Sequence, residues 1–100
     1  MQQKLFNSKL GITEDDVRTE TSFGKLFTWQ FSIEEQLEGI RGKVDEVRTE
    51  QYEGEMTEED FQKSEQFLVN LSTVSKAQSR LLRMIHNRKD ELLLSKLGNW

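Results

Sequence analysis

The sequence predicts a mainly α fold, an antiparallel helical hairpin whose second helix is longer than its first. Two stretches of apolar residues recur at helical spacing, and the connection between them, around residues 53–56, is only a few residues long. A connection that short makes the two helices antiparallel neighbours. The chain also contains no proline, which would interrupt a helical hydrogen-bond ladder. The first stripe consists of Ile33, Leu37, Ile40, Val44 and Val47, and the second of Phe61, Phe67, Leu68, Leu71, Val74, Leu81, Leu82, Ile85, Leu92 and Leu93.

The first long helix is expected over 32–53. Ser32 and Glu35 have the spacing of a capping box, in which the serine accepts from a backbone N–H and the glutamate reaches back. Gly54 is expected to end the helix. Gly39 and Gly42 lie inside it, and their presence in a helix has two equally acceptable interpretations. Either they admit a second backbone at close range, or they are tolerated on the solvated side.

The second long helix is expected over 57–98, with Thr57 as its N-cap and Gly98 at its C-terminal end. The segment 86–90 is polar throughout, and Lys89 falls at the centre of the apolar arc. We therefore expect a kink or break near Asn87, which is itself a suitable cap for a new helix.

Residues 1–31 are expected to form an N-terminal arm of the same single domain, 1–100. Thr13 followed by acidic residues predicts the start of a short helix. The aromatic segment 23–31 fits a strand by its alternation and a helix by its other spacing, and both remain open. In either form we expect Phe27 and Phe31 to lie in the core, whereas Trp29 suits a core position and an interface anchor equally.

If the first helix begins at residue 32, the second helix extends beyond it from about residue 78. The apolar side chains of this overhang then need another cover, so we expect a homo-oligomer, a dimer or larger. The residues expected at this oligomer or partner interface are Trp29, Leu81, Leu82, Ile85, Leu92 and Leu93.

Composition narrows the class of protein further. The net charge is −4, and the chain has neither cysteine nor a long apolar segment, so we expect a soluble, cytoplasmic protein with no membrane contact. Residues 1–60 carry fifteen acidic and seven basic side chains, a balance of −8, whereas 61–100 carry three acidic and seven basic ones, a balance of +4. The two parts are therefore expected to attract each other or, for the basic part, an acidic partner.

The residues give little support to an enzyme. His86 is the single histidine, and no cysteine or carboxylate stands at ligand spacing from it. Phosphate-binding glycine motifs are absent, and the acidic clusters are explained by first helical turns. We therefore expect no catalytic residue, no metal and no cofactor.

One group of residues favours binding. Lys76, Arg80 and Arg83 step along one stripe of the second helix, which the helical wheel places facing away from the first helix, and Arg88 and Lys89 extend the positive charge. This basic ridge suits an acidic protein surface or a polyanion, although solvated helices often carry such stripes.

The sequence thus predicts a non-enzymatic, oligomeric interaction protein that binds, holds or inhibits a macromolecular partner. Small acidic helical chains without cysteine are common among accessory factors of phages and mobile elements, and such an origin is one expectation. A nucleic-acid-binding module that uses the basic ridge is the alternative, which the overall acidity disfavours. A ligand-sequestering oligomer with sites between subunits is a further alternative.

Overall fold

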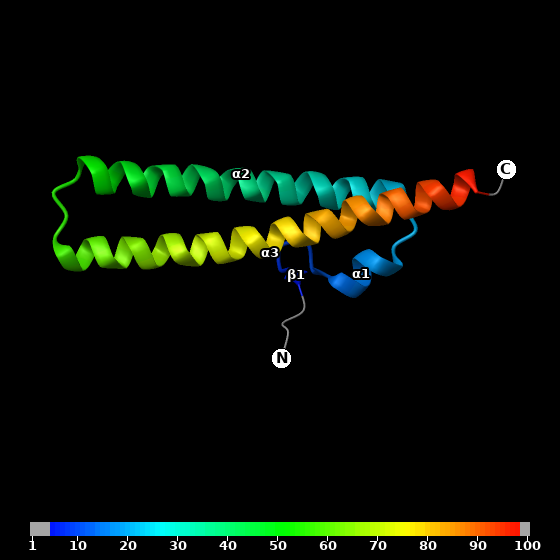
Figure 1. The fold of residues 1–100 in the computed structure, drawn as a ribbon, viewed down its shortest axis with the longest axis horizontal. Helices are drawn as coiled ribbons and strands as arrows, with labels where there is room; N and C mark the ends of the chain where they lie inside the picture. The colour runs from blue at the N-terminus through cyan, green and yellow to red at the C-terminus, as the bar shows by residue number, and fades with distance from the viewer. Residues whose placement is uncertain (1–4, 99–100) are drawn as a thin grey trace.

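The computed structural model describes residues 5–98 and confirms a mainly α hairpin (Figure 1). Two long helices, α2 (Phe23–Glu53) and α3 (Glu58–Leu97), lie antiparallel and give the molecule extents of 65 × 29 × 19 Å. A short helix α1 (Glu14–Thr19) and a two-stranded antiparallel sheet of β1 (Phe6–Asn7) and β2 (Ile12–Thr13) precede them. Within residues 5–98, no helix is long and apolar enough to cross a membrane.

Four of the predicted helix ends are confirmed, and one of them is Gly98, whose backbone N–H donates to the carbonyl oxygen of Leu94 at the C-terminal end of α3. Thr13 caps α1 in a complete capping box with Asp16, and the Thr57 hydroxyl accepts the backbone N–H of Asp60 at 3.1 Å to cap α3. Gly54 ends α2, where a Cβ would lie 2.5 Å from the carbonyl oxygen of Glu50. A side chain cannot be accommodated at that distance, so the turn between the long helices requires glycine here.

The predicted start of the first long helix is wrong. α2 begins ten residues before Ile33, at Phe23, and its N-cap is Ser22, whose hydroxyl accepts the backbone N–H of Lys25 at 3.3 Å. Ser32 lies inside the helix and accepts a hydrogen bond from the side chain of Gln36 at 3.2 Å. The capping-box spacing at Ser32 was misleading because a cap at Ser22 lets the helix start earlier.

The segment 23–31 is therefore helical, and the strand reading is wrong. Helical spacing turns Leu26 inward, where it is fully buried, and Trp29 is partly buried against the core. Phe27 and Phe31 face outward and are 55% and 65% exposed, so their expected core role is also wrong. The alternating aromatic residues of 23–31 therefore did not indicate a β-strand.

The expected break near Asn87 is absent, because α3 runs without interruption from Glu58 to Leu97. The two cations beside it are held by neighbouring elements. The Arg88 side chain donates from Nε to the carbonyl oxygen of Glu20 at 2.8 Å. The Lys89 ammonium donates to Gln30 Oε1 and lies 4.2 Å from the centre of the Phe27 ring. A lysine on the apolar arc is thus accommodated without breaking the helix.

The N-terminal arm, residues 5–22, folds back onto the hairpin. Its tight turn uses Gly11 at φ +66°, a conformation that favours glycine. Asn7 in the arm is only 1% exposed, and its amide nitrogen donates to Gln36 Oε1 at 2.9 Å and to Gln78 Oε1 at 2.6 Å. The arm is therefore attached to both long helices by one buried amide.

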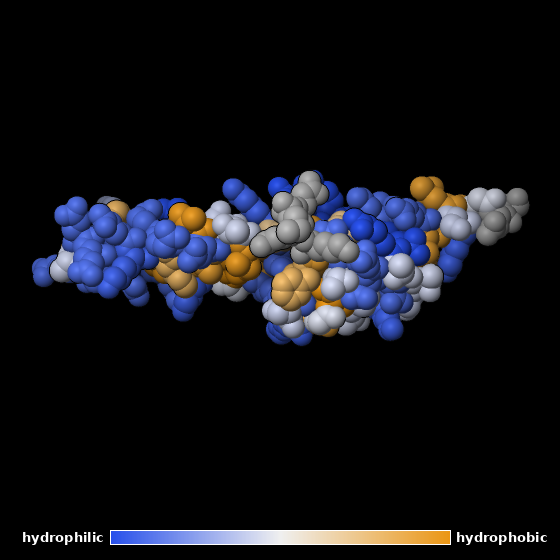
Figure 2. All heavy atoms as spheres, turned by 90° about the horizontal axis from the view of Figure 1, so that it is seen from below, coloured by the Kyte–Doolittle hydropathy of each residue, from blue (hydrophilic) through white to orange (hydrophobic). Residues whose placement is uncertain are grey.

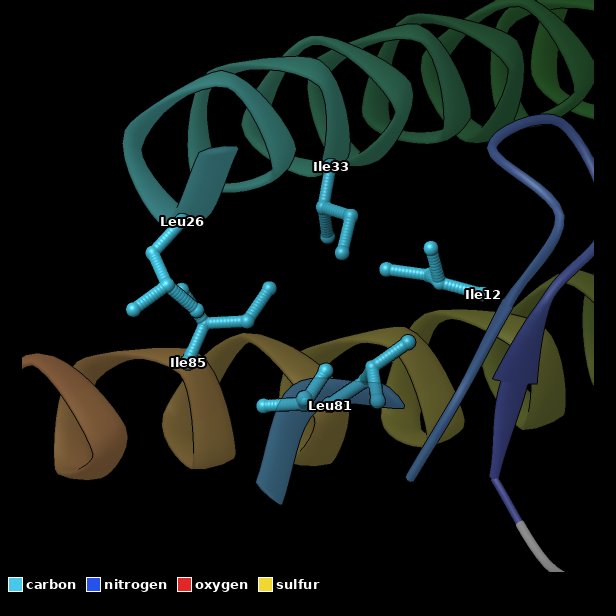
Figure 3. Close-up of a cluster of buried hydrophobic side chains, with 6 residues drawn as sticks. Ile12, Leu26, Ile33, Leu81 and Ile85 are labelled. Atoms are coloured by element: carbon cyan, nitrogen blue, oxygen red, sulfur yellow. The ribbon is translucent and has the colours of Figure 1, made fainter. Parts of the chain in front are cut away.

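The core lies where the arm meets the hairpin (Figure 3). Ile12 from the arm, Leu26 and Ile33 from α2, and Leu81 and Ile85 from α3 point toward one another. We call this part the covered half, comprising the arm, residues 23–36 and residues 77–97. The remaining part, residues 37–53 and 58–76, we call the open half, because two helices alone form it.

Candidate functional site

A groove of about 490 Å³ runs between α2 and α3 in the open half. Its size is in the range of small-molecule and peptide sites. Each helix contributes about three turns to it, so the groove is elongated along the hairpin. It is lined by Leu37, Ile40, Arg41, Val44 and Arg48 of α2 and by Leu68, Leu71, Ser72, Ser75, Lys76 and Ser79 of α3.

The groove exists because the α3 side chains that face α2, which form the seam between the two helices, are short here. Ser75 stands four residues after Leu71, at the seam position where a leucine would reach α2. Ser72 and Ser79 lie beside it and are equally short. In the described open half only Val47 and Leu68 are buried, at 9% and 8% exposure. The small side chains therefore leave the apolar floor accessible.

The charged residues that line the groove are all cations. Arg41 has a weak partner in Glu38 at 3.6 Å, with both side chains about three-quarters exposed. Among residues 5–98, Arg48 and Lys76 have neither an ion pair nor a hydrogen bond from their side chains. A chain of net charge −4 thus carries a local positive site with room for carboxylates.

The arm does not cover this groove. It is attached through Gln36 and Gln78. At about 100° per residue, those two positions lie on the opposite side of the seam from Arg41, Arg48 and Lys76. The part of the arm that the structure describes, residues 5–22, therefore leaves the groove open.

The basic ridge predicted from sequence is divided in the structure. Lys76, Arg80 and Arg83 are exposed, but Lys76 lines the groove beside α2, so the expectation that it faces away from α2 is wrong. Arg88 and Lys89 are half-buried and hold Glu20 and Gln30, which leaves them less available to a ligand. Three of the five predicted cations thus remain free to bind.

The predicted interface residues lie mainly inside the covered half. Leu81 and Ile85 are fully buried, because α2 begins early enough to lie opposite them, and the overhang expected from residue 78 is therefore wrong. Trp29, Leu82 and Leu92 are partly buried against the same core, and only Leu93, 51% exposed, is widely accessible. The accessible groove floor lies instead nearer the turn.

Sequence reasoning missed the groove residues other than Lys76. One signal was available: Arg41 and Arg48 are seven residues apart and flank the apolar stripe of α2. Ser75 on the apolar arc was also visible, but only the pairing of the helices shows which residues it faces. Within residues 5–98, no group of three or more histidines or carboxylates is placed to hold a metal ion.

Comparison with protein-family models, with curated proteins and with solved structures gives no significant match to this chain. The function is therefore argued from the groove and its surroundings. What these residues offer is apolar contact, hydroxyl groups and positive charge.

Proposed function

We propose that this chain is a non-enzymatic, self-associating helical interaction protein that binds a macromolecular partner through its open half. The observation that carries the proposal is the division of the hairpin. The covered half holds the core, whereas the open half has an apolar groove and, among the described residues, only two buried apolar side chains, although large apolar side chains are exposed in both halves. In the open half the exposed large apolar side chains are Tyr52, at 92%, and Phe61, Phe67, Val69 and Val74, between 40% and 56% exposed.

Packing energetics support this reading. Two helices alone bury little apolar surface, and most helical stability in water comes from tertiary packing of an apolar face. Figure 2 shows hydrophobic residues at the surface of the part of the hairpin toward the turn, beyond the arm. An accessible apolar groove of this kind suits an interaction site. A third or fourth helix placed on the open half completes its packing.

Self-association is tested by light scattering on the intact chain over a range of concentrations. We expect at least a dimer at tens of micromolar. Ile40→Asp places a charge on the groove floor and is expected to weaken association about tenfold or more, since burying an unpaired charge is unfavourable. Leu94→Asp is the matched control, because Leu94 is 66% exposed and outside the open half. A wild-type monomer at every concentration contradicts the proposal.

A second candidate is nucleic-acid binding, which the exposed cations Lys76, Arg80 and Arg83 favour. If duplex DNA binds there, affinity falls steeply with salt, because phosphate neutralisation releases counterions. Exchanging the three cations for glutamine reduces that salt dependence. Tight, salt-sensitive binding to duplex DNA favours nucleic-acid binding over self-association as the function. If the chain does not bind duplex DNA at physiological salt, self-association remains the proposed function.

A further inference from the structure

One exposed stripe of α2 carries the chemistry that the groove lacks. Phe31 is 65% exposed, and Glu34 and Glu38 follow on the same face at i+3 and i+7. Glu35, also exposed, lies beside them. We call Phe31, Glu34, Glu35 and Glu38 the acidic stripe. It combines one large apolar side chain with three carboxylates.

The groove is its chemical complement. An apolar floor is bordered by Arg41, Arg48 and Lys76, and no acidic residue of the described range 5–98 lines it. We propose that the groove receives the acidic stripe of a second copy of this chain. The proposal deepens and rests on the self-association proposed above, because it names the two surfaces that meet.

The arrangement closes as a symmetric dimer. The acidic stripe, 31–38, and the α2 wall of the groove, 37–48, follow each other along the same helix. If the α2 helices of two copies lie antiparallel about a twofold axis near residues 40–41, each stripe meets the other copy's groove. Such an interface uses the same patch twice and closes at two copies.

The side chains suit this contact. Phe31 reaches the apolar floor, Glu34 faces the α2 wall with Arg48, and Glu35 or Glu38 faces Lys76 on α3. Gly42 lies on the same face of α2 as Phe31 and has no atom within 4 Å of its ideal Cβ position. It therefore admits the second backbone at close range near the axis. Opposite charges across an interface fix its orientation and disfavour other pairings.

A polyanion is a weaker occupant of this groove. Its floor consists of aliphatic side chains, and among residues 5–98 no aromatic side chain lines it on which a base can stack. The acidic stripe of a second copy supplies an apolar side chain for the groove floor and carboxylates for its cationic border, and both lie on one helix.

The test uses reciprocal charge reversal of the full chain. Arg48→Glu with Lys76→Glu is expected to raise the dimer Kd about 100-fold by sedimentation, and Glu34→Lys with Glu35→Lys to raise it equally. Mixing the two double variants restores association as a heterodimer, because one groove–stripe pair is then complementary on each side. Circular dichroism checks that both variants keep their helical content.

The matched control is Lys43→Glu with Lys63→Glu, the same charge change on the same two helices but away from the groove lining. It leaves the Kd within about twofold. Charge-driven docking also predicts that raising salt from about 0.05 to 0.5 M weakens the wild-type dimer. A dimer that Ile40→Asp disrupts but that both reversals leave intact overturns this inference and keeps the proposed function. A wild-type monomer overturns both.

Discussion

Asn7 connects the arm to both long helices through the hydrogen bonds of its side chain. Its amide nitrogen donates to Gln36 and Gln78, and its side-chain oxygen accepts the backbone N–H of Leu10 at 2.9 Å. Gln78 in turn donates to the carbonyl oxygen of Phe6 at 3.0 Å. Asn7 itself is 1% exposed, and no buried side-chain polar atom of residues 5–98 lacks a hydrogen-bond partner, so a change at Asn7 leaves several polar groups without partners.

Asn7→Ala is therefore expected to destabilise the chain by about 1–3 kcal/mol, the usual effect of leaving buried polar groups unsatisfied. Urea denaturation followed by circular dichroism measures the loss. Asn70→Ala is the control, because Asn70 is exposed and accepts from Gln66 at 3.1 Å on the surface of α3. An equal loss at both positions contradicts the role given to Asn7.

Gly39 and Gly42 present a different question, because no atom of the chain lies within 4 Å of a Cβ at either position. In the monomer Gly39→Ala and Gly42→Ala are each expected to stabilise α2 by up to about 1 kcal/mol, the helix propensity difference. Thermal melting at concentrations below association measures this. Gly42→Ala is expected to weaken the dimer, whereas Gly39→Ala is not. If the two substitutions affect association equally, Gly42 is a glycine tolerated on the solvated side of α2 and does not contact a second copy.

At the scale of elements, the ends of helices were the most predictable feature. Thr13 and Thr57 act through side chains and backbone groups three residues away, so local sequence is sufficient to identify them. Ser32 shows the limit, since its capping pattern is local but the start of α2 is set by packing. Leu26 is buried in a cluster that includes Leu81 and Ile85, which are more than fifty residues away.

The continuity of α3 shows the same limit. The polar segment around Asn87 suggested a break, but Arg88 and Lys89 find partners in the arm and in α2. Contacts between distant elements cannot be read from a helical wheel. The groove was missed for the same reason. The short side chain of Ser75 leaves a hollow only where α3 packs beside α2, and the sequence does not show that pairing.

Two substitutions in residues 23–31 test which side chains of α2 face the core and which face outward. Trp29→Ala removes an aromatic side chain packed against the core, and we expect a loss on the order of 2–3 kcal/mol, below the ~3–5 kcal/mol of a fully buried one. For a chain of this size that lowers the melting temperature by roughly 10 °C. Phe31→Ala, at 65% exposure, is expected to leave the monomer's melting within a few degrees. The reverse order contradicts the helical register.

At the scale of the whole molecule, the two halves of the hairpin differ in what holds them. Ile12 and Val17 of the arm, together with α2 and α3, form one contiguous buried cluster in the covered half. The open half has two helices and two buried apolar residues among those described, Val47 and Leu68. Its seam ends in a polar contact, from Gln51 Nε2 to Ser64 Oγ at 2.7 Å.

This asymmetry predicts a gradient of local stability along the hairpin. Segments with few buried apolar contacts open with low free energy, so amides of the open half, 37–53 and 58–76, are expected to exchange hydrogen faster than those of 23–36 and 77–92. Hydrogen exchange on the dilute protein measures the difference. At concentrations where copies associate, protection is expected to rise in the open half and in the acidic stripe, while the covered end 77–92 changes little. Uniform protection in the dilute protein shows instead that two helices alone suffice to hold the open half.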